Sequence, residues 1–186
     1  SVVLKNSIQL AGDSTIDTRA NNSSIYGIIN GIGSLTKAGI GSLTLSGVNT
    51  YTGKTLINAG KVIINNDQSL GQNNQAQFAE GTSLETTVSI RLATPLTLVG
   101  NTTLRTLNNS QLDLAGSLSG AGRLNKEGDG SLIISGSNSN INGISVIAGT
   151  LIASTDDSLG AASATLKLDG GSFQSSTSTD YKHAIE

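Results

Sequence analysis

The chain has 186 residues, and 23 Gly, 26 Ser, 20 Thr and 17 Asn make nearly half of it small or amide-bearing. Another quarter is aliphatic, with 18 Ile, 22 Leu and 7 Val, which is more than disordered chains carry. Aromatic residues reach only 3%, which excludes a core built around large rings. A net charge of −2 excludes an electrostatic nucleic-acid interface and a polybasic membrane patch.

The absence of cysteine excludes a disulfide scaffold and any thiolate metal site. No stretch approaches the roughly 20 apolar residues of a membrane helix, and no basic start leads into an apolar signal segment. We therefore expect neither a membrane-spanning chain nor a precursor. The abrupt start at Ser1 and end at Glu186 suggest a section of a longer protein.

In chain order, the first predicted strands lie in the segment IQLAGDSTI, which begins at Ile8. Residues 42–46 (SLTLS) alternate leucine with hydroxyl residues, as half-buried strands do. Further inward landmarks follow, each 19 to 22 residues after the last: Leu43, Val62, Leu84, Leu104 and Leu124. No helical spacing persists over three turns, so the pattern indicates an all-β protein.

The chain repeats itself at an offset of 89 residues. Residues 31–71 match residues 120–160 without a gap, and 18 of these 41 positions are identical. The segment from Leu96 (LTLVGNTTL) resembles the one from Ile8 at an offset of 88. We therefore predict one segment over 1–186 that consists of two repeats, approximately 8–95 and 96–186.

A 20-residue recurrence inside an 89-residue unit means about four rungs for each unit. Three strands of four or five residues, together with the corners between them, take up about 20 residues. Each turn of the chain therefore returns to a position above its start. The pattern predicts a right-handed parallel β-helix of roughly eight rungs. Asparagines are expected to serve as corner residues that tolerate the left-handed backbone region; they are Asn49, Asn58, Asn138 and Asn142.

Two other architectures fit the composition less well. A β-sandwich needs hairpin turns, but Asn-Gly occurs only at 30–31 and 142–143 and Asp-Gly only at 129–130 and 169–170. A β-propeller usually carries an aromatic signature in each blade, which is missing here.

Three stretches of the first repeat carry a family resemblance: GSLTKAGIGSLTLSG (33–47), NTYTG (49–53) and INAG (57–60). Together they resemble the autotransporter-associated β-strand repeat, also called the passenger-associated transport repeat. The second repeat departs from this pattern where Asn140 stands in place of Tyr51 and the turn reads NSNIN.

The resemblance implies a type V secreted passenger of a Gram-negative bacterium, exported through the outer membrane to the cell surface or beyond. It implies a β-helical stalk or adhesin that binds host surface proteins, glycans or itself, with repeats that aid export and folding. It also implies an outer-membrane translocator barrel, C-terminal in the parent chain, as a partner. A secreted effector that binds a host receptor is the alternative, and a carbohydrate-active β-helix enzyme is a weaker one.

Catalytic, cofactor-binding and metal residues are expected to be absent, and no cofactor is expected. The single histidine, His183, lies near the end of the chain, where partners for a catalytic or metal role would be few. Paired carboxylates could serve a glycosidase or lyase, but Asp156 and its repeat counterpart Asp67 are interpreted as turn caps. Glu127 and Asp129 are interpreted as a solvated corner.

Two lysines and three tyrosines remain as candidates for binding. Lys37 and Lys126 occupy the same place in both repeats, and the sequence favours lysines that cover a corner over contacts to an anionic glycan. Tyr26, Tyr51 and Tyr181 could anchor a ligand, but they are scattered, and Tyr51 belongs to the turn of the repeat.

Overall fold

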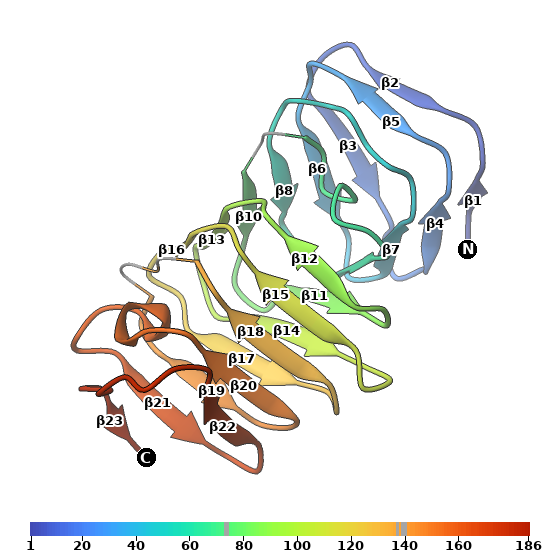
Figure 1. The fold of residues 1–186 in the computed structure, drawn as a ribbon. Helices are drawn as coiled ribbons and strands as arrows, with labels where there is room; N and C mark the ends of the chain where they lie inside the picture. Colours follow the sequence, from blue (N-terminus) through green and yellow to red (C-terminus); the bar gives the residue numbers. More distant parts are fainter. Residues whose placement is uncertain (73–74, 137, 139–140) are drawn as a thin grey trace.

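The structure is a computed structural model that describes residues 1–72, 75–136, 138 and 141–186. The chain winds into a long coil, and each winding passes three faces in the same order (Figure 1). All strand pairs in the described part of the chain are parallel, which confirms the expected all-β parallel β-helix; it has about eight turns. The one short helix in that part is a 3-10 turn, η1 (Asp156–Leu159).

The first face is a single sheet that runs the length of the coil. Its ten strands are β1 (Val3–Leu4), β4 (Ser23–Ile25), β7 (Ser42–Leu45), β9 (Lys61–Ile64), β11 (Ser83–Thr86), β14 (Thr102–Thr106), β17 (Leu124–Glu127), β19 (Ile144–Val146), β21 (Thr165–Leu168) and β23 (Ala184–Ile185).

The other two faces are interrupted. The second face has six strands: β3 (Ser14–Asp17), β6 (Leu35–Ala38), β8 (Thr55–Ile57), β10 (Ala76–Phe78), β13 (Leu96–Leu98) and β16 (Leu118–Ser119). The third face has a two-stranded sheet of β2 (Ile8–Leu10) and β5 (Ile29–Gly31). After a gap it continues with five strands: β12 (Ile90–Leu92), β15 (Gln111–Leu114), β18 (Ser131–Ile134), β20 (Thr150–Ala153) and β22 (Ser172–Ser175).

Inward side chains stack from turn to turn. Leu43, Val62, Leu84 and Leu104 are successive register partners, as the 19- to 22-residue recurrence predicts. The expectation that Leu124 is the next member of this ladder is wrong, because Leu104 pairs with Lys126 and Leu124 pairs with Thr102. The buried methylene stem of Lys126 thus continues the aliphatic ladder.

The two repeats lie on different faces of the coil. In the first repeat, β6 and β8 belong to the second face and β7 and β9 to the first face. Their counterparts 89 residues later are one face further along: β17 and β19 lie on the first face, and β18 and β20 on the third. One repeat therefore spans four turns and one additional face.

This rotation determines where the sheets stop. The two irregular segments of the first repeat, residues 47–54 and 65–72, cross the third face and separate β5 from β12. In the second repeat, the second face has no strand after β16 among the described residues, and the described residues 154–161 lie between β20 on the third face and β21 on the first. Each repeat thus interrupts a different sheet.

A buried asparagine in each repeat joins three successive turns. The Asn49 side chain accepts a hydrogen bond from the Ile29 amide (2.9 Å) and donates one to the Ser69 carbonyl (2.7 Å). Asn138 does the same with Leu118 (2.9 Å) and Ser158 (2.7 Å).

The expectation that these asparagines adopt the left-handed backbone region is wrong, because the non-glycine residues with positive φ among the described ones are Arg19, Asn108 and Asn109. Asn58 and Asn142 are exposed. The amides of Asn49 and Asn138 instead satisfy polar backbone groups inside the coil, where buried polar groups need a hydrogen-bond partner.

Close packing at the corners makes some glycines indispensable. A Cβ atom at Gly41 would lie 1.9 Å from the carbonyl oxygen of Asn21 in the preceding turn, whereas one at Gly12 would meet no atom within 4 Å. We expect Gly41→Ala to destabilise the protein by about 1–3 kcal/mol, because the backbone of one turn must move. Thermal unfolding followed by circular dichroism should show a lower Tm for Gly41→Ala and little change for Gly12→Ala; equal Tm values would contradict this packing.

Candidate functional site

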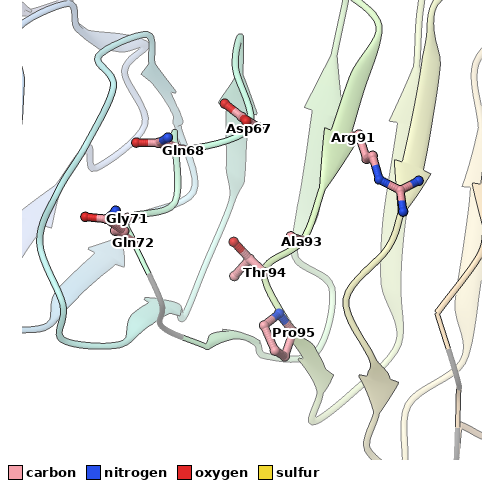
Figure 2. A pocket seen from close by; sticks show the side chains of 8 residues that line it. All are labelled: Asp67, Gln68, Gly71, Gln72, Arg91, Ala93, Thr94 and Pro95. Atoms are coloured by element: carbon pink, nitrogen blue, oxygen red, sulfur yellow. The ribbon is translucent and has the colours of Figure 1, made fainter.

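A polar groove opens on the third face, in the gap between the loop 65–72 and the chain that leads from β12 to β13. Its volume is about 510 Å³ (Figure 2). One wall carries Asp67, Gln68, Gly71 and Gln72, and the other carries Arg91, Ala93, Thr94 and Pro95. Smaller hollows of about 310 and 220 Å³ share Arg91 with it and extend the groove along the face.

The loop wall is held by its own polar side chains. The Ser69 hydroxyl donates to the Leu45 carbonyl (2.9 Å) and accepts from the amides of Asn65 (3.3 Å) and Asn66 (3.2 Å). The Asn66 side chain accepts from the amide of Gln68 (3.0 Å). The interpretation of Asp67 as the turn cap is therefore wrong, because Asn66 and Ser69 cap the turn and Asp67 is left exposed in the groove.

The opposite wall begins at β12, the edge strand of the five-stranded sheet. Arg91 points outward between inward Ile90 and Leu92, and its guanidinium forms an ion pair with Asp113 on β15. In Figure 2 this guanidinium is directed away from the other lining residues. The groove itself therefore offers mainly hydrogen-bond acceptors and amides, with the carboxylate of Asp67 as its free charge.

A buried tyrosine supports the loop wall from behind. Tyr51 is fully buried, its hydroxyl lies 2.6 Å from that of Thr55, and its carbonyl accepts from the Gln72 amide (3.0 Å). Burial raises the pKa of the Tyr51 hydroxyl, because the phenolate would lose its hydration. The neutral hydroxyl is thus a fixed part of the folded core.

Tyr51 should contribute to alkaline instability. Above pH 10 an unfolded tyrosine loses its proton but the folded Tyr51 does not, so the free energy of unfolding falls by about 1.4 kcal/mol at pH 11. Tyr51→Phe should remove this part of the pH dependence. Urea unfolding at pH 9 and 11 measures it, and an identical change in both proteins would argue against a buried neutral Tyr51.

The acidic residues weighed in the sequence analysis lie in two separate environments. Asp156 lies 2.8 Å from His183 Nδ1 and accepts from the amide of Lys182 (2.9 Å), while Asp157 is exposed. These hydrogen bonds, chiefly the one from the Lys182 amide, lower the pKa of Asp156. His183 is buried.

Glu127 is part of a charge ladder on the first face. Its carboxylate lies 3.3 Å from Arg105 Nε, and Arg105 in turn lies 3.2 Å from Glu85. Lys61, one turn earlier, contacts the same Glu85 oxygen at 2.9 Å. Alternating signs on four successive strands make this ladder a surface ion-pair network.

The two equivalent lysines are core residues. Lys37 Nζ donates to the carbonyls of Ala38 (3.0 Å), Gly39 (2.6 Å) and Ala59 (2.9 Å), and Lys126 occupies the same three-carbonyl cage in the second repeat. Burial lowers the pKa of Lys37 and lowers that of Lys126 to about 8, although nearby Asp129 and Glu127 oppose the shift. The structure thus supports the corner role of these lysines, with the ammonium closing the corner from inside.

The three tyrosines do not form a common surface. Tyr26 is about half exposed, and Tyr181 packs edge-on against Phe173 with ring centres 5.2 Å apart. Within the described residues, no group of three His, Asp or Glu side chains could hold a metal ion. No helix in the described part of the chain is both long and apolar enough to cross a membrane.

The sheets and the internal core define the chain as a parallel β-solenoid with two rotated repeats. Residues 35–64 and 124–153 match the passenger-associated transport repeat, so this is an autotransporter passenger segment, as the sequence predicts. It is located at the bacterial surface or secreted, after export through the outer membrane.

The chain is also similar to the adhesin BmaC autotransporter of Brucella suis biovar 1 (strain 1330). The two are 34% identical over 141 residues, which is 75% of this chain and 4% of the relative. The chain thus spans a small fraction of that relative's length. No solved structure matches it.

Proposed function

We propose that this segment is a β-helical stalk and adhesin module that binds host surfaces or other copies of itself, without enzymatic activity. The observation that supports it best is the similarity to a segment of a protein named an adhesin. The outward Ser and Thr side chains on all three faces add to it, because they can form repeated hydrogen bonds with a partner. The C-terminal translocator barrel of a parent chain would deliver it.

The second part of the proposal concerns export and folding. Parallel turns can be added one at a time as a chain leaves a pore, and each buries aliphatic surface worth about 25 cal/mol/Å². Asn49 and Asn138 contribute here because each joins the turn before it to the turn after it. The repeats would then favour outward movement of the chain without ATP.

Adhesion can be tested with beads that carry the purified segment. We expect such beads to attach to host epithelial cells or to aggregate with each other, and soluble segment to compete with both processes. Beads that carry a segment with Gly41→Ala, heated above its Tm, are the control for folded structure. Beads that neither attach nor aggregate would contradict the adhesin role. A signalling response to soluble segment without attachment would favour the effector alternative.

A further inference from the structure

The second repeat contains a filled counterpart of the groove. The 89-residue offset relates Asp67 to Asp156, Gln72 to Ala161 and Thr94 to His183. The same offset relates β11 to β22, so the correspondence of the two repeats extends beyond the transport motif in the structure as well.

In that counterpart the chain itself occupies the space. His183 Nδ1 lies 2.8 Å from the Asp156 carboxylate, and His183 Nε2 lies 2.9 Å from the Ala161 carbonyl. The amide of Lys182 donates to the same Asp156 oxygen (2.9 Å). The His183 side chain is only 2% exposed, so the ring fills the gap between the loop and the next turn.

The first repeat has the acceptors but lacks the donor. Thr94 stands where His183 stands, and its short side chain leaves the groove open. Asp67 makes no hydrogen bond or ion pair with any described residue. The groove therefore contains the counterpart of the Asp156 carboxylate, on the equivalent loop of the first repeat.

We propose that this groove binds an extended segment of another polypeptide, which places a histidine side chain between Asp67 and Gln72. An adjacent backbone amide of the ligand donates to Asp67, as Lys182 does to Asp156. This inference rests on the proposed adhesin role, and it names the kind of partner that one site takes.

The chemistry of the walls favours such a ligand over a sugar. The central groups are acceptors, a carboxylate and a backbone carbonyl, and they match the two ring N–H groups of a protonated histidine side chain. Charge assistance from the carboxylate strengthens these hydrogen bonds. None of the described residues that line the groove has an aromatic side chain on which a sugar ring could stack, and the apolar side chains among them are those of Ala93 and Pro95.

The direct test uses the peptide Ac-Tyr-Lys-His-Ala-NH2, which copies residues 181–184, and the intact chain labelled with 15N. We expect saturable shifts of the amide signals of the loop 65–72 and of residues 91–94 at peptide concentrations of about 5 mM or below. The matched peptide Ac-Tyr-Lys-Leu-Ala-NH2 should bind about tenfold more weakly, since it lacks the donor ring. Equal binding of both peptides, no binding at all, or preferential binding of maltohexaose at the same amides would overturn the proposal.

Three variants make the test specific. Asp67→Asn should weaken peptide binding about tenfold through loss of the charge-assisted bond. Thr94→His should abolish it and raise the Tm, because the chain then fills its own groove as it does in the second repeat. Asp169→Asn, an exposed carboxylate elsewhere on the surface, should bind the peptide as the wild type does. Unchanged affinity in both groove variants would refute the site.

The same variants separate this proposal from the adhesin role. If beads carrying Thr94→His attach to cells as well as the wild type does although peptide binding is lost, the groove binds peptides but does not mediate adhesion. If the wild type binds the peptide but its beads do not attach, the adhesin role fails and the groove stands. If beads attach and the peptide does not bind, the groove proposal alone is refuted.

Discussion

Simultaneous substitution of four inward residues, Leu43→Ser, Leu45→Ser, Leu132→Ser and Ile134→Ser, is expected to prevent folding and to reduce surface display of the full passenger. All four side chains are at most 1% exposed and stack on aliphatic register partners in neighbouring turns. Each loss of a buried aliphatic side chain costs about 2–5 kcal/mol. Four together cost about 8–20 kcal/mol, which equals or exceeds most of the roughly 5–15 kcal/mol that stabilises a typical domain.

The matched control places substitutions on the same two strands but on outward residues, Thr44→Ser and Ile133→Ser. Flow cytometry with an epitope tag measures display, and circular dichroism of the isolated segment measures folding. Control and wild type should be displayed equally. If the inward variant is displayed as well as the control, turn-by-turn burial does not drive export.

Single substitutions of the bridging asparagines should have the next largest effect. Asn49→Leu leaves the amide of Ile29 and the carbonyl of Ser69 without partners inside the coil, and Asn138→Leu does the same to Leu118 and Ser158. Two unsatisfied buried groups cost about 2–6 kcal/mol in each variant. Urea unfolding should therefore show a lower midpoint for each.

Asn58→Leu provides the comparison for these variants, because Asn58 is exposed in the same repeat. Its midpoint should stay close to that of the wild type. Because each bridge joins three turns, the double variant Asn49→Leu/Asn138→Leu should lose cooperativity as well as stability. Midpoints that match that of Asn58→Leu would show that water satisfies the freed backbone groups.

The architecture could be predicted from the sequence because alternation and repetition constrain it directly. Inward leucines every 19 to 22 residues require stacked parallel turns, and the register of Leu43, Val62 and Leu84 follows this spacing. The same alternation places Lys37 on the inward side, two residues after Leu35. The alternation therefore indicates that Lys37 is buried, although lysine is seldom buried without partners.

The rotation of the second repeat could not be predicted in the same way. An offset of 89 residues is close to four turns of the greatest length, and it also fits four shorter turns and one further face, because turn length varies from 19 to 22 residues. The sheet membership of the strands decides between them: β6 lies on the second face, and its counterpart β17 lies on the first. The groove was missed as well, since its walls lie on separate turns; its one sequence signal is the exchange of Thr94 for His183 at equivalent positions.

The change of face between repeats has a consequence for longer arrays. If further units of this length followed one another, each would point its loops about 120° away from those of the unit before, and orientation would recur only after about thirteen windings. Neighbouring units would then never crowd the same flank. A fibre built in this way would present loops in three directions around its axis, so that one set would face an opposing surface in any orientation of the fibre.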